Sequence, residues 1–469
     1  MVFANLLFLY LFLPLNLLFY FLSQKIVYRN LVLVCFSFLF YAWGEPVWVF
    51  LLMTSAAFDY MHGRLIERYR GSWVAKAAVV SSLCLNLGLL ITFKYSGFLV
   101  QNLNAILGTA FPVPAFALPI GISFYTFQTI SYVIDVYRGD TKAQQNPVYY
   151  LLYLSMYHQL VAGPVVRYAD VASEIRHRTV DAASFSEGAT RLIYGLCKKV
   201  IVANAAGKLV DQYMGAGLSG LSVAGAWFGA LMFTLQIYYD FSGYSDMAIG
   251  LGRMFGFHYK ENFNYPYIAK SATEFWRRWH ISLSSFFRDY VYIPLGGNRK
   301  HQYLNLLAVW FLTGFWHGAS WNFILWGLYF GFFIALEKKF LLGILQRLPA
   351  VVQHLYLLLI AVVGWVLFYF TDMKRLGGYL SVMFGLSGNR LWDSQVEITL
   401  LNNLFWLILA VVFCLPIVKE IKREVSERMN AGRIQVALCG QAFINLALLL
   451  ICTAQLVGQS YNPFLYYRF

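Results

Sequence analysis

Charged residues are scarce in this chain. Only 12% of its 469 residues are Asp, Glu, Lys or Arg, whereas 59% are hydrophobic and 19% are aromatic. The mean hydropathy is +0.58. So few charges cannot cover the surface of a water-soluble globule of this size. The composition therefore excludes a soluble protein and predicts an all-α polytopic membrane protein.

Closely spaced cysteines, internal repeats and long polar linkers are also missing. The six cysteines lie far apart and mostly in apolar segments, at Cys35, Cys84, Cys197, Cys414, Cys439 and Cys452. This spacing implies no metal site and no disulfide framework. Without a linker, residues 1–469 are expected to form one membrane domain, with its characteristic motifs in 118–327 and further helices in 351–469.

Long apolar runs fill most of the chain. About 20 residues are needed to cross about 30 Å of hydrocarbon, and roughly ten to twelve spans are predicted on this basis, with some of them broken. The windows are 3–23, 31–60, 77–95, 115–137, 147–166, 191–212, 223–251, 303–336, 351–371, 399–418 and 435–457. The first window has no basic segment before it, so we interpret it as a retained helix and not as a signal peptide.

The net charge of +14 could suggest a nucleic-acid partner, but the basic residues occur in short loops between apolar windows. They are better explained as topology determinants. Lys25 and Arg29 follow the first window, which predicts an extracytoplasmic N-terminus. Gly44-Glu45-Pro46 interrupts the window 31–60. Each half has about 13 residues, or about 20 Å at helical rise, so a bent hairpin is expected there.

His317 lies inside the apolar run FLTGFWHGASWNFILWGLYFG. An ionisable side chain at membrane depth costs several kcal/mol unless it faces a cavity or a partner, so a functional site is the first hypothesis and a structural histidine the alternative. A second histidine, His280, precedes it by 37 residues. The two imidazoles are expected to meet in one polar pocket. Gly314 and Gly318 would let the backbone bend, or let another helix or a substrate approach His317.

The tract 253–300 is too polar to span a membrane and too aromatic for a free loop. Ser271 and Glu274 have the spacing of a capping box and predict the start of an amphipathic helix. At about 100° per residue, one arc of this helix is apolar. That arc contains Phe275, Trp276, Trp279, Leu283, Phe286, Phe287 and Tyr290. His280 falls at its edge, Arg277 and Arg278 fall outside it, and the tract is expected to form the floor of the site.

Two aspartates, Asp240 and Asp246, lie in the apolar window 223–251. They predict a polar seam in which helices are held together by paired polar groups.

Taken together, these segments resemble the membrane-bound O-acyltransferase family, in particular its bacterial branch that includes the alginate O-acetylation and teichoic-acid D-alanylation membrane proteins. The motifs that carry the resemblance occur in the family's order. They are LPIGISFYTFQTISYVIDVYRGD at 118–140, LVAGPVVRY at 160–168, GLCKKVIVAN at 195–204, YYDFSGYSDMAIGLGRMFGF at 238–257, ENFNYPY at 261–267, SATEFWRRWHISLSSFFRDYVYIPLGGNR at 271–299, GFWHGASWNFILWG at 314–327 and the C-terminal YNPFLYYRF.

The resemblance implies a ring of helices around a thinned centre, with a funnel from each face. It implies that His317 is catalytic and that His280 is a supporting pocket residue. It also implies an extracytoplasmic serine-hydrolase-like partner protein. Eukaryotic relatives pair the catalytic histidine with an upstream asparagine or aspartate, a role that is not carried over because His280 occupies the comparable spacing.

Acyl transfer from a thioester to a hydroxyl needs a general base, a stabiliser for the oxyanion and exclusion of water. We expect neutral His317 to be the base, with His280, Asn322 or Ser320 bonding its other nitrogen or the oxyanion. Arg277 and Arg278 could contact a phosphate of the donor, although interfacial anchoring is an alternative. Trp316 completes the candidate donor or acceptor contacts, with a packing role as its alternative.

The chain is thus expected to be an O-acyltransferase of the bacterial inner membrane that acetylates an extracytoplasmic polysaccharide such as alginate, directly or through a partner. The donor would be acetyl-CoA or a phosphopantetheinyl acyl carrier protein, with no bound cofactor or metal. Teichoic acid and peptidoglycan are alternative acceptors. A proton-coupled transporter and a haem-binding electron carrier are alternatives from other classes.

Overall fold

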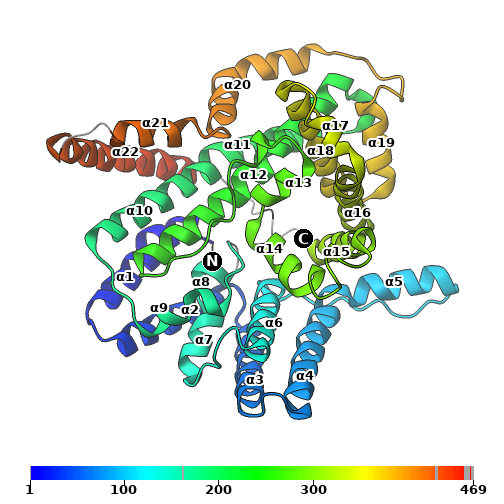
Figure 1. Cartoon of the computed structure of the whole chain (residues 1–469). Coiled ribbons are helices and arrows are strands. Elements are labelled where there is room, and N and C mark those ends of the chain that lie inside the picture. The colour runs from blue at the N-terminus through cyan, green and yellow to red at the C-terminus, as the bar shows by residue number, and fades with distance from the viewer. Residues whose placement is uncertain (1, 161–162, 428–430, 459–464, 466–469) are drawn as a thin grey trace. The chain divides into compact units, whose positions relative to one another are not determined.

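The computed structural model describes residues 2–160, 163–427, 431–458 and 465 (Figure 1). These form two compact units, each built from two stretches of the chain. Unit 1 contains Met1–Leu192 and Tyr244–Glu261, and unit 2 contains Ile193–Gly243 and Asn262–Phe469. Part of the predicted span 147–166 and all of the motif YNPFLYYRF except Leu465 lie outside the described residues.

All the secondary-structure elements in the described part of unit 1 are helices. Its elements are the π-helix Phe8–Phe12, α1 Leu13–Phe21, α2 Ile26–Gly44, α3 Trp48–Arg68, α4 Trp73–Leu90, the π-turn Ile91–Tyr95, α5 Ser96–Leu107, α6 Ile122–Arg138, α7 Pro147–Ser155, α8 Tyr157–Leu160, α9 Tyr168–Arg176, the first part of α10 Ala182–Cys197 and the last part of α12 Val223–Met254. Helices α3, α4 and α6 pack against one another.

Unit 2 contains the remainder of α10 and α12. Its other long helices are α11 Asn204–Tyr213, α15 Gln302–His317, α16 Trp321–Leu336, α18 Ala350–Tyr369, α19 Met373–Met383, α20 Ser394–Phe413, α21 Ile417–Glu427 and α22 Ala431–Gly458. Its short elements are the π-helix Lys198–Ala203, the 3-10 turns Leu218–Gly220 and Pro266–Ile268, α13 Ala272–Arg278, α14 Ile281–Phe287, the π-helices Arg288–Tyr292 and Glu337–Leu341, and α17 Leu342–Leu345.

Five helical stretches in the described residues are long and apolar enough to cross a membrane. They are Ile26–Gly44, Trp73–Leu107, Ala350–Tyr369, Ser394–Phe413 and Val436–Gly458. Many of the other helices are shorter than 18 residues, as α6, α15 and α16 are. The helical membrane class is therefore confirmed, whereas the count of ten to twelve spans and the ring remain predictions.

The break at Gly44-Glu45-Pro46 is confirmed, because α2 ends at Gly44 and α3 begins at Trp48. The expected half-lengths are wrong. Helix α2 has 19 residues and α3 has 21, because both continue into the polar residues beyond the apolar window. Each is about 30 Å long, so neither is a short half-helix.

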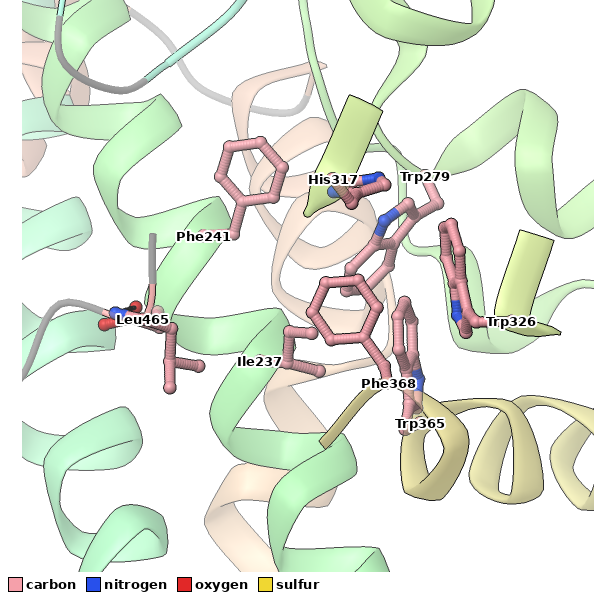
Figure 2. A pocket seen from close by; sticks show the side chains of 9 residues that line it. Ile237, Phe241, Trp279, His317, Trp326, Trp365, Phe368 and Leu465 are labelled. Carbon is pink, nitrogen blue, oxygen red and sulfur yellow. Dashed lines mark hydrogen bonds between the residues drawn. The ribbon is translucent and has the colours of Figure 1, made fainter. Parts of the chain in front are cut away.

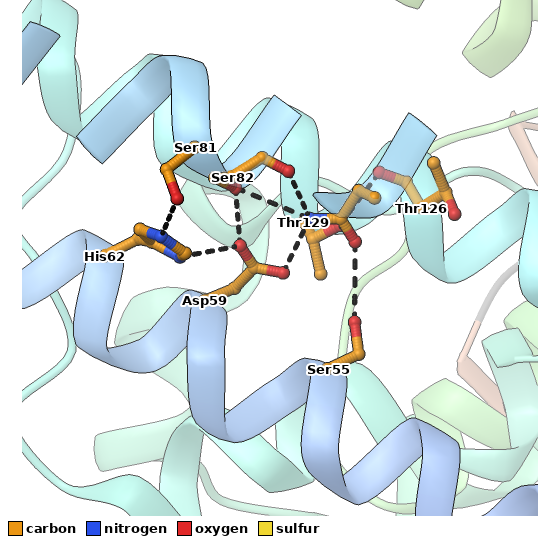
Figure 3. Close-up of polar contacts among 8 residues, drawn as sticks. Ser55, Asp59, His62, Ser81, Ser82, Thr126 and Thr129 are labelled. Atoms are coloured by element: carbon orange, nitrogen blue, oxygen red, sulfur yellow. Dashed lines mark hydrogen bonds and ion pairs between the residues drawn. The ribbon is translucent and has the colours of Figure 1, made fainter. Parts of the chain in front are cut away.

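A buried polar cluster joins α3, α4 and α6 in unit 1 (Figure 3). The carboxylate of Asp59 accepts hydrogen bonds from Ser82 Oγ at 2.5 Å and Asn86 Nδ2 at 2.8 Å. His62 Nδ1 lies 3.5 Å from the same carboxylate. Thr129 donates to Asn86 Oδ1 at 3.1 Å. Hydrogen bonds of this kind hold membrane helices together, because apolar helix faces gain little by leaving lipid for one another.

The amphipathic helix expected after Ser271 is not continuous. It consists of α13 and α14, separated at Trp279 and His280, because His280 adopts the left-handed conformation with φ 44° and ψ 55°. The start is as predicted, since Ser271 Oγ accepts from the backbone N–H of Glu274 at 3.0 Å. All seven residues of the predicted apolar arc are buried in spite of the break. The sequence pattern therefore predicted which side chains are buried. It did not predict the break at His280, which depends on contacts with residues distant in the chain.

Candidate active site

His317 is the last residue of α15, and α16 begins four positions later at Trp321. The two helices run side by side as a hairpin of 16 residues each (Figure 1). Each is therefore about 24 Å long, shorter than the hydrocarbon thickness of about 30 Å. Irregular backbone at membrane depth is tolerated only where it is buried in protein or lines a cavity. The turn that carries His317 lines a cavity, which is one of the two settings that allow irregular backbone in a membrane.

Glycines bring the two helices of the hairpin into contact. The Cα of Gly314 lies against that of Gly327, and a Cβ at either position would overlap backbone of the other helix. A Cβ at Gly318 would overlap the ring of Phe323. Gly314 and Gly318 were predicted to allow either the approach of another helix or that of a substrate. The approach of another helix is confirmed, because both glycines lie against residues of α16.

A small cavity of about 20 Å³, roughly the space that one water molecule needs, lies in unit 2 beside His317 (Figure 2). It is lined by Ile237, Asp240, Phe241, Trp279, His317, Trp326, Trp365, Phe368 and Leu465. Most of these side chains are apolar or aromatic, and among the described lining residues the ionisable ones are His317 and Asp240. Such a wall is mainly apolar and presents few polar groups, as the walls of ligand sites generally do.

Aromatic rings surround the imidazole of His317. The ring centroids of Trp316 and Trp326 both lie 4.9 Å from that of His317, and the centroid of Phe368 lies at 5.3 Å. All three rings stand at 70° to 86° to the imidazole plane. The faces of aromatic rings attract cations, so a ring that presents its face to an imidazole stabilises the protonated form of that imidazole.

Asp240 forms a buried ion pair with Lys199. Lys199 Nζ lies 2.6 Å from Asp240 Oδ1, and both side chains are almost fully buried. The other carboxylate oxygen accepts from the backbone N–H of Leu465 at 3.1 Å. In unit 1, Asp246 pairs with Arg191 at 2.8 Å. The polar seam predicted from the two aspartates is therefore confirmed, and Asp240 also faces the cavity.

His280 is the N-terminal residue flanking α14 and is 1% exposed. Its ring lies 4.6 Å from that of Phe241 and 6.4 Å from that of Trp316. Because Trp316 also contacts His317, one indole separates the two histidines. Burial lowers the pKa of His280 to about 3, so its neutral form prevails at pH 7. The two histidines belong to one aromatic cluster, although no direct contact joins them.

The two candidate arginines differ in their surroundings. Arg278 is paired with Glu274 at 2.9 Å and donates to the carbonyl of Asn264 at 3.2 Å. Arg277 is exposed. Lys338, in Glu337–Leu341, has its pKa lowered by partial burial and by the nearby Arg277. Arg277 and Lys338 thus form a concentration of positive charge, to which an anion can bind.

The remaining candidates lie close to the hairpin turn. Trp316 is buried between the histidine rings. Asn322 is fully buried, and its amide donates to the carbonyl oxygens of Leu367 at 3.2 Å and Phe368 at 3.0 Å, so it attaches α16 to the end of α18. Ser320 flanks the start of α16, and its side chain makes no capping hydrogen bond.

Sequence reasoning missed most of the wall of the cavity. Trp326, Trp365 and Phe368 lie in apolar windows, where nothing distinguishes them from lipid-facing residues. Lys338 directly follows an apolar helix, and a lysine in such a place could have been considered as a contact for an anion from the sequence alone. Asn262, in the motif ENFNYPY, bonds directly to His280 and gave no signal of its own.

Residues 142–382 match the family model of the membrane-bound O-acyltransferase family. The chain belongs to this family and is an acyltransferase, as its motifs indicated. It is 39% identical, over the full length of both chains, to a probable alginate O-acetylase, AlgI, of Azotobacter vinelandii. The corresponding protein of Pseudomonas aeruginosa is 43% identical, over 82% of this chain and 75% of that protein. A peptidoglycan O-acetyltransferase of Helicobacter pylori is 33% identical, over 81% of this chain and 79% of that protein.

Proposed function

We propose that this protein transfers an acetyl group from a cytoplasmic thioester to hydroxyl groups of an extracytoplasmic polysaccharide such as alginate, in the bacterial inner membrane. The observation that carries the proposal is the position of His317, at the turn of a short hairpin and in the wall of a cavity. The acceptor class is supported by the similarity to probable alginate O-acetylases.

In the proposed reaction, Nδ1 or Nε2 of His317 takes the proton of the acceptor hydroxyl as its oxygen attacks the thioester carbonyl. The carbon–sulfur bond then breaks, and the imidazolium returns the proton to the departing thiolate. The aromatic rings around His317 stabilise the transient positive charge and keep water from hydrolysing the thioester.

The donor is proposed to be acetyl-CoA or an acylated phosphopantetheinyl carrier protein. Both present phosphate groups, and the positive charges of Arg277 and Lys338 are suited to bind them. Arg278 is already paired with Glu274, so its contribution to donor binding is the smaller one. An extracytoplasmic serine-hydrolase-like protein is proposed as the partner that carries the acetyl group onward. The N-terminus is proposed to be extracytoplasmic.

The test is the replacement His317→Ala, followed by measurement of polymer acetylation in cells and of acetyl transfer by purified protein. Acetylation is expected to be abolished, while the variant still inserts into the membrane and purifies with the wild-type yield. The matched control is His177→Ala, at an exposed histidine after α9, which should keep full activity. Polymer acetylation that survives His317→Ala would refute the assignment.

Peptidoglycan is the second candidate acceptor, because a peptidoglycan O-acetyltransferase is among the relatives that cover four fifths of the chain. Teichoic acid is a third and involves D-alanyl or acetyl transfer, because two teichoic acid D-alanyltransferases each match 47% of the chain. Chemical analysis of ester-linked acetyl and D-alanyl groups in each isolated polymer, with and without the protein, distinguishes the three. The membership of the family favours a transferase over the transporter and haem-carrier alternatives.

A further inference from the structure

We infer that Asn262 is a positioning residue that holds His280 in the tautomer with hydrogen on Nδ1, leaving Nε2 as a free acceptor for a hydroxyl or thiol. The importance of this for acyl transfer rests on the proposed function, whereas the tautomer itself does not. The inference is carried by a set of contacts between the segment that begins at Asn262 and the break between α13 and α14.

The side chain of Asn262 has an orientation that its neighbours fix. Its Oδ1 accepts from the backbone N–H of Ser282 at 3.2 Å and from the Ser282 hydroxyl at 2.8 Å. A backbone N–H can only donate, so the atom that faces it must be the amide oxygen and not the amide nitrogen. Asn262 is 0% exposed, so bulk water does not compete for these hydrogen bonds.

The same oxygen lies 3.1 Å from Nδ1 of His280. An amide oxygen has no hydrogen to donate, so the hydrogen of this bond must belong to Nδ1. In a neutral imidazole only one nitrogen carries a hydrogen, and Nε2 is then a lone-pair acceptor. Nε2 is buried and has no hydrogen-bond partner among the described residues. A buried acceptor without a partner is unfavourable, and such an atom is expected where a ligand supplies the missing hydrogen.

The backbone holds the imidazole in place. His280 has φ 44°, a conformation that residues with a Cβ adopt rarely and that is found preferentially at functional sites. The strain is sustained by two pairings with the segment 262–264: the N–H of Ile281 donates to the carbonyl of Asn262 at 2.9 Å, and that of Asn264 donates to the carbonyl of Arg278 at 2.9 Å. Asn262 therefore binds the break through both its main chain and its side chain.

The free Nε2 selects the chemistry of its ligand. It repels carbonyl and carboxylate oxygens and accepts from O–H or S–H groups, which are the acceptor hydroxyl and the thiol of the departing donor. Neutral His280 in this tautomer cannot donate through Nε2 and therefore does not stabilise an oxyanion there. Both histidines contact Trp316, so a group bound at Nε2 of His280 would lie in the same aromatic cluster as His317.

The experiment combines nitrogen NMR with kinetics. Protein labelled with ¹⁵N-histidine is reconstituted in lipid nanodiscs, and the His280 signals are assigned by their loss in His280→Asn. Protonated and bare ring nitrogens have well-separated shifts, so the tautomer is read directly. The wild type is expected to carry its hydrogen on Nδ1. Asn262→Asp keeps the acceptor oxygen and should keep this tautomer, whereas Asn262→Leu removes it and should lose the Nδ1–H signature.

For acetyl transfer, Asn262→Leu is expected to lower kcat at least about tenfold with little change in KM, as a wrong tautomer does in other histidine enzymes. Asn262→Asp should restore most of the rate. A second variant is Ser282→Ala, which removes another donor to the same oxygen and a hydroxyl 3.4 Å from Nδ1 of His280, while it leaves the bond between Asn262 and His280. It should keep both tautomer and rate.

A wild-type His280 with its hydrogen on Nε2 would overturn the inference, as would an Asn262→Leu variant that keeps both the Nδ1–H signature and the rate. An Nδ1–H tautomer that depends on Asn262 in a protein without acetyl-transfer activity would support the positioning role and count against the proposed function alone.

Discussion

At the scale of single residues, the chain contains a buried pair of opposite charges. Lys199 and Asp240 are both almost inaccessible and form a pair at 2.6 Å. An ion pair in such a place adds little stability compared with apolar residues, but the removal of one partner leaves an uncompensated charge. Without Lys199, the carboxylate of Asp240 would line the cavity beside His317 with no counter-charge. The sequence does not show that Asp240 depends on Lys199, because the two residues are distant in the chain.

We predict that Lys199→Met lowers the free energy of unfolding by about 3–5 kcal/mol, because Asp240 loses its counter-charge. The double variant Lys199→Met with Asp240→Leu should recover much of this loss. Unfolding in detergent, followed by intrinsic tryptophan fluorescence, measures both. As a control, Arg253→Gln breaks an exposed pair with Glu187, and a change of at most about 1 kcal/mol is expected there. Equal effects at Lys199 and Arg253 would contradict the prediction.

His280 also predicts how stability depends on pH. Its pKa falls from 6.5 to about 3 on burial, so between these values the unfolded state binds more protons than the folded state. The free energy of unfolding should therefore decrease as the pH falls from about 6.5 toward 3. This contribution is absent in His280→Asn, since asparagine tolerates the left-handed conformation and does not titrate. Melting temperatures between pH 7 and pH 4 should fall more steeply for the wild type, and parallel curves would refute this.

At the scale of elements, the hairpin α15–α16 decides the position of the proposed base. Two helices of 16 residues approach closely because glycines face each other at Gly314 and Gly327. The turn between them places His317 at the end of a helix instead of in its middle. The apolar run predicted an interrupted segment here, but its sequence could not distinguish contact between helices from contact with a substrate.

Gly327→Ala tests this packing. A Cβ at Gly327 would overlap the carbonyl oxygen of Trp310 and the backbone of Gly314, so the helices must separate. Overpacking typically costs about 1–3 kcal/mol, and the displacement of His317 should lower the acetylation rate as well. Gly343→Ala is the matched control in α17, since nothing lies within 4 Å of its Cβ position. There alanine should be neutral or stabilising by up to about 1 kcal/mol. Unfolding and acetyl-transfer assays on both variants make the comparison.

At the scale of the whole molecule, two units share the helices α10 and α12, and each unit has its own buried polar contacts. In unit 1 these are centred on Asp59, and in unit 2 on Asp240. A membrane protein gains little from apolar packing against apolar lipid, so such contacts specify which helices associate. The expectation of one domain in residues 1–469 stays a prediction, as does the floor formed by 253–300.

The sequence alone determined the helical membrane class and the family, because hydropathy and motif order are local properties of the chain. It also singled out His317 and His280, whose roles stay predictions. It also determined which side chains after Ser271 are buried, since all seven residues of the apolar arc are inaccessible. Only the tertiary structure decided that the helix breaks at His280, that α2 and α3 are full-length helices, and that Asn262 bonds the imidazole. The physical reason is that strained backbone and buried hydrogen bonds depend on partners distant in sequence, which no local pattern contains.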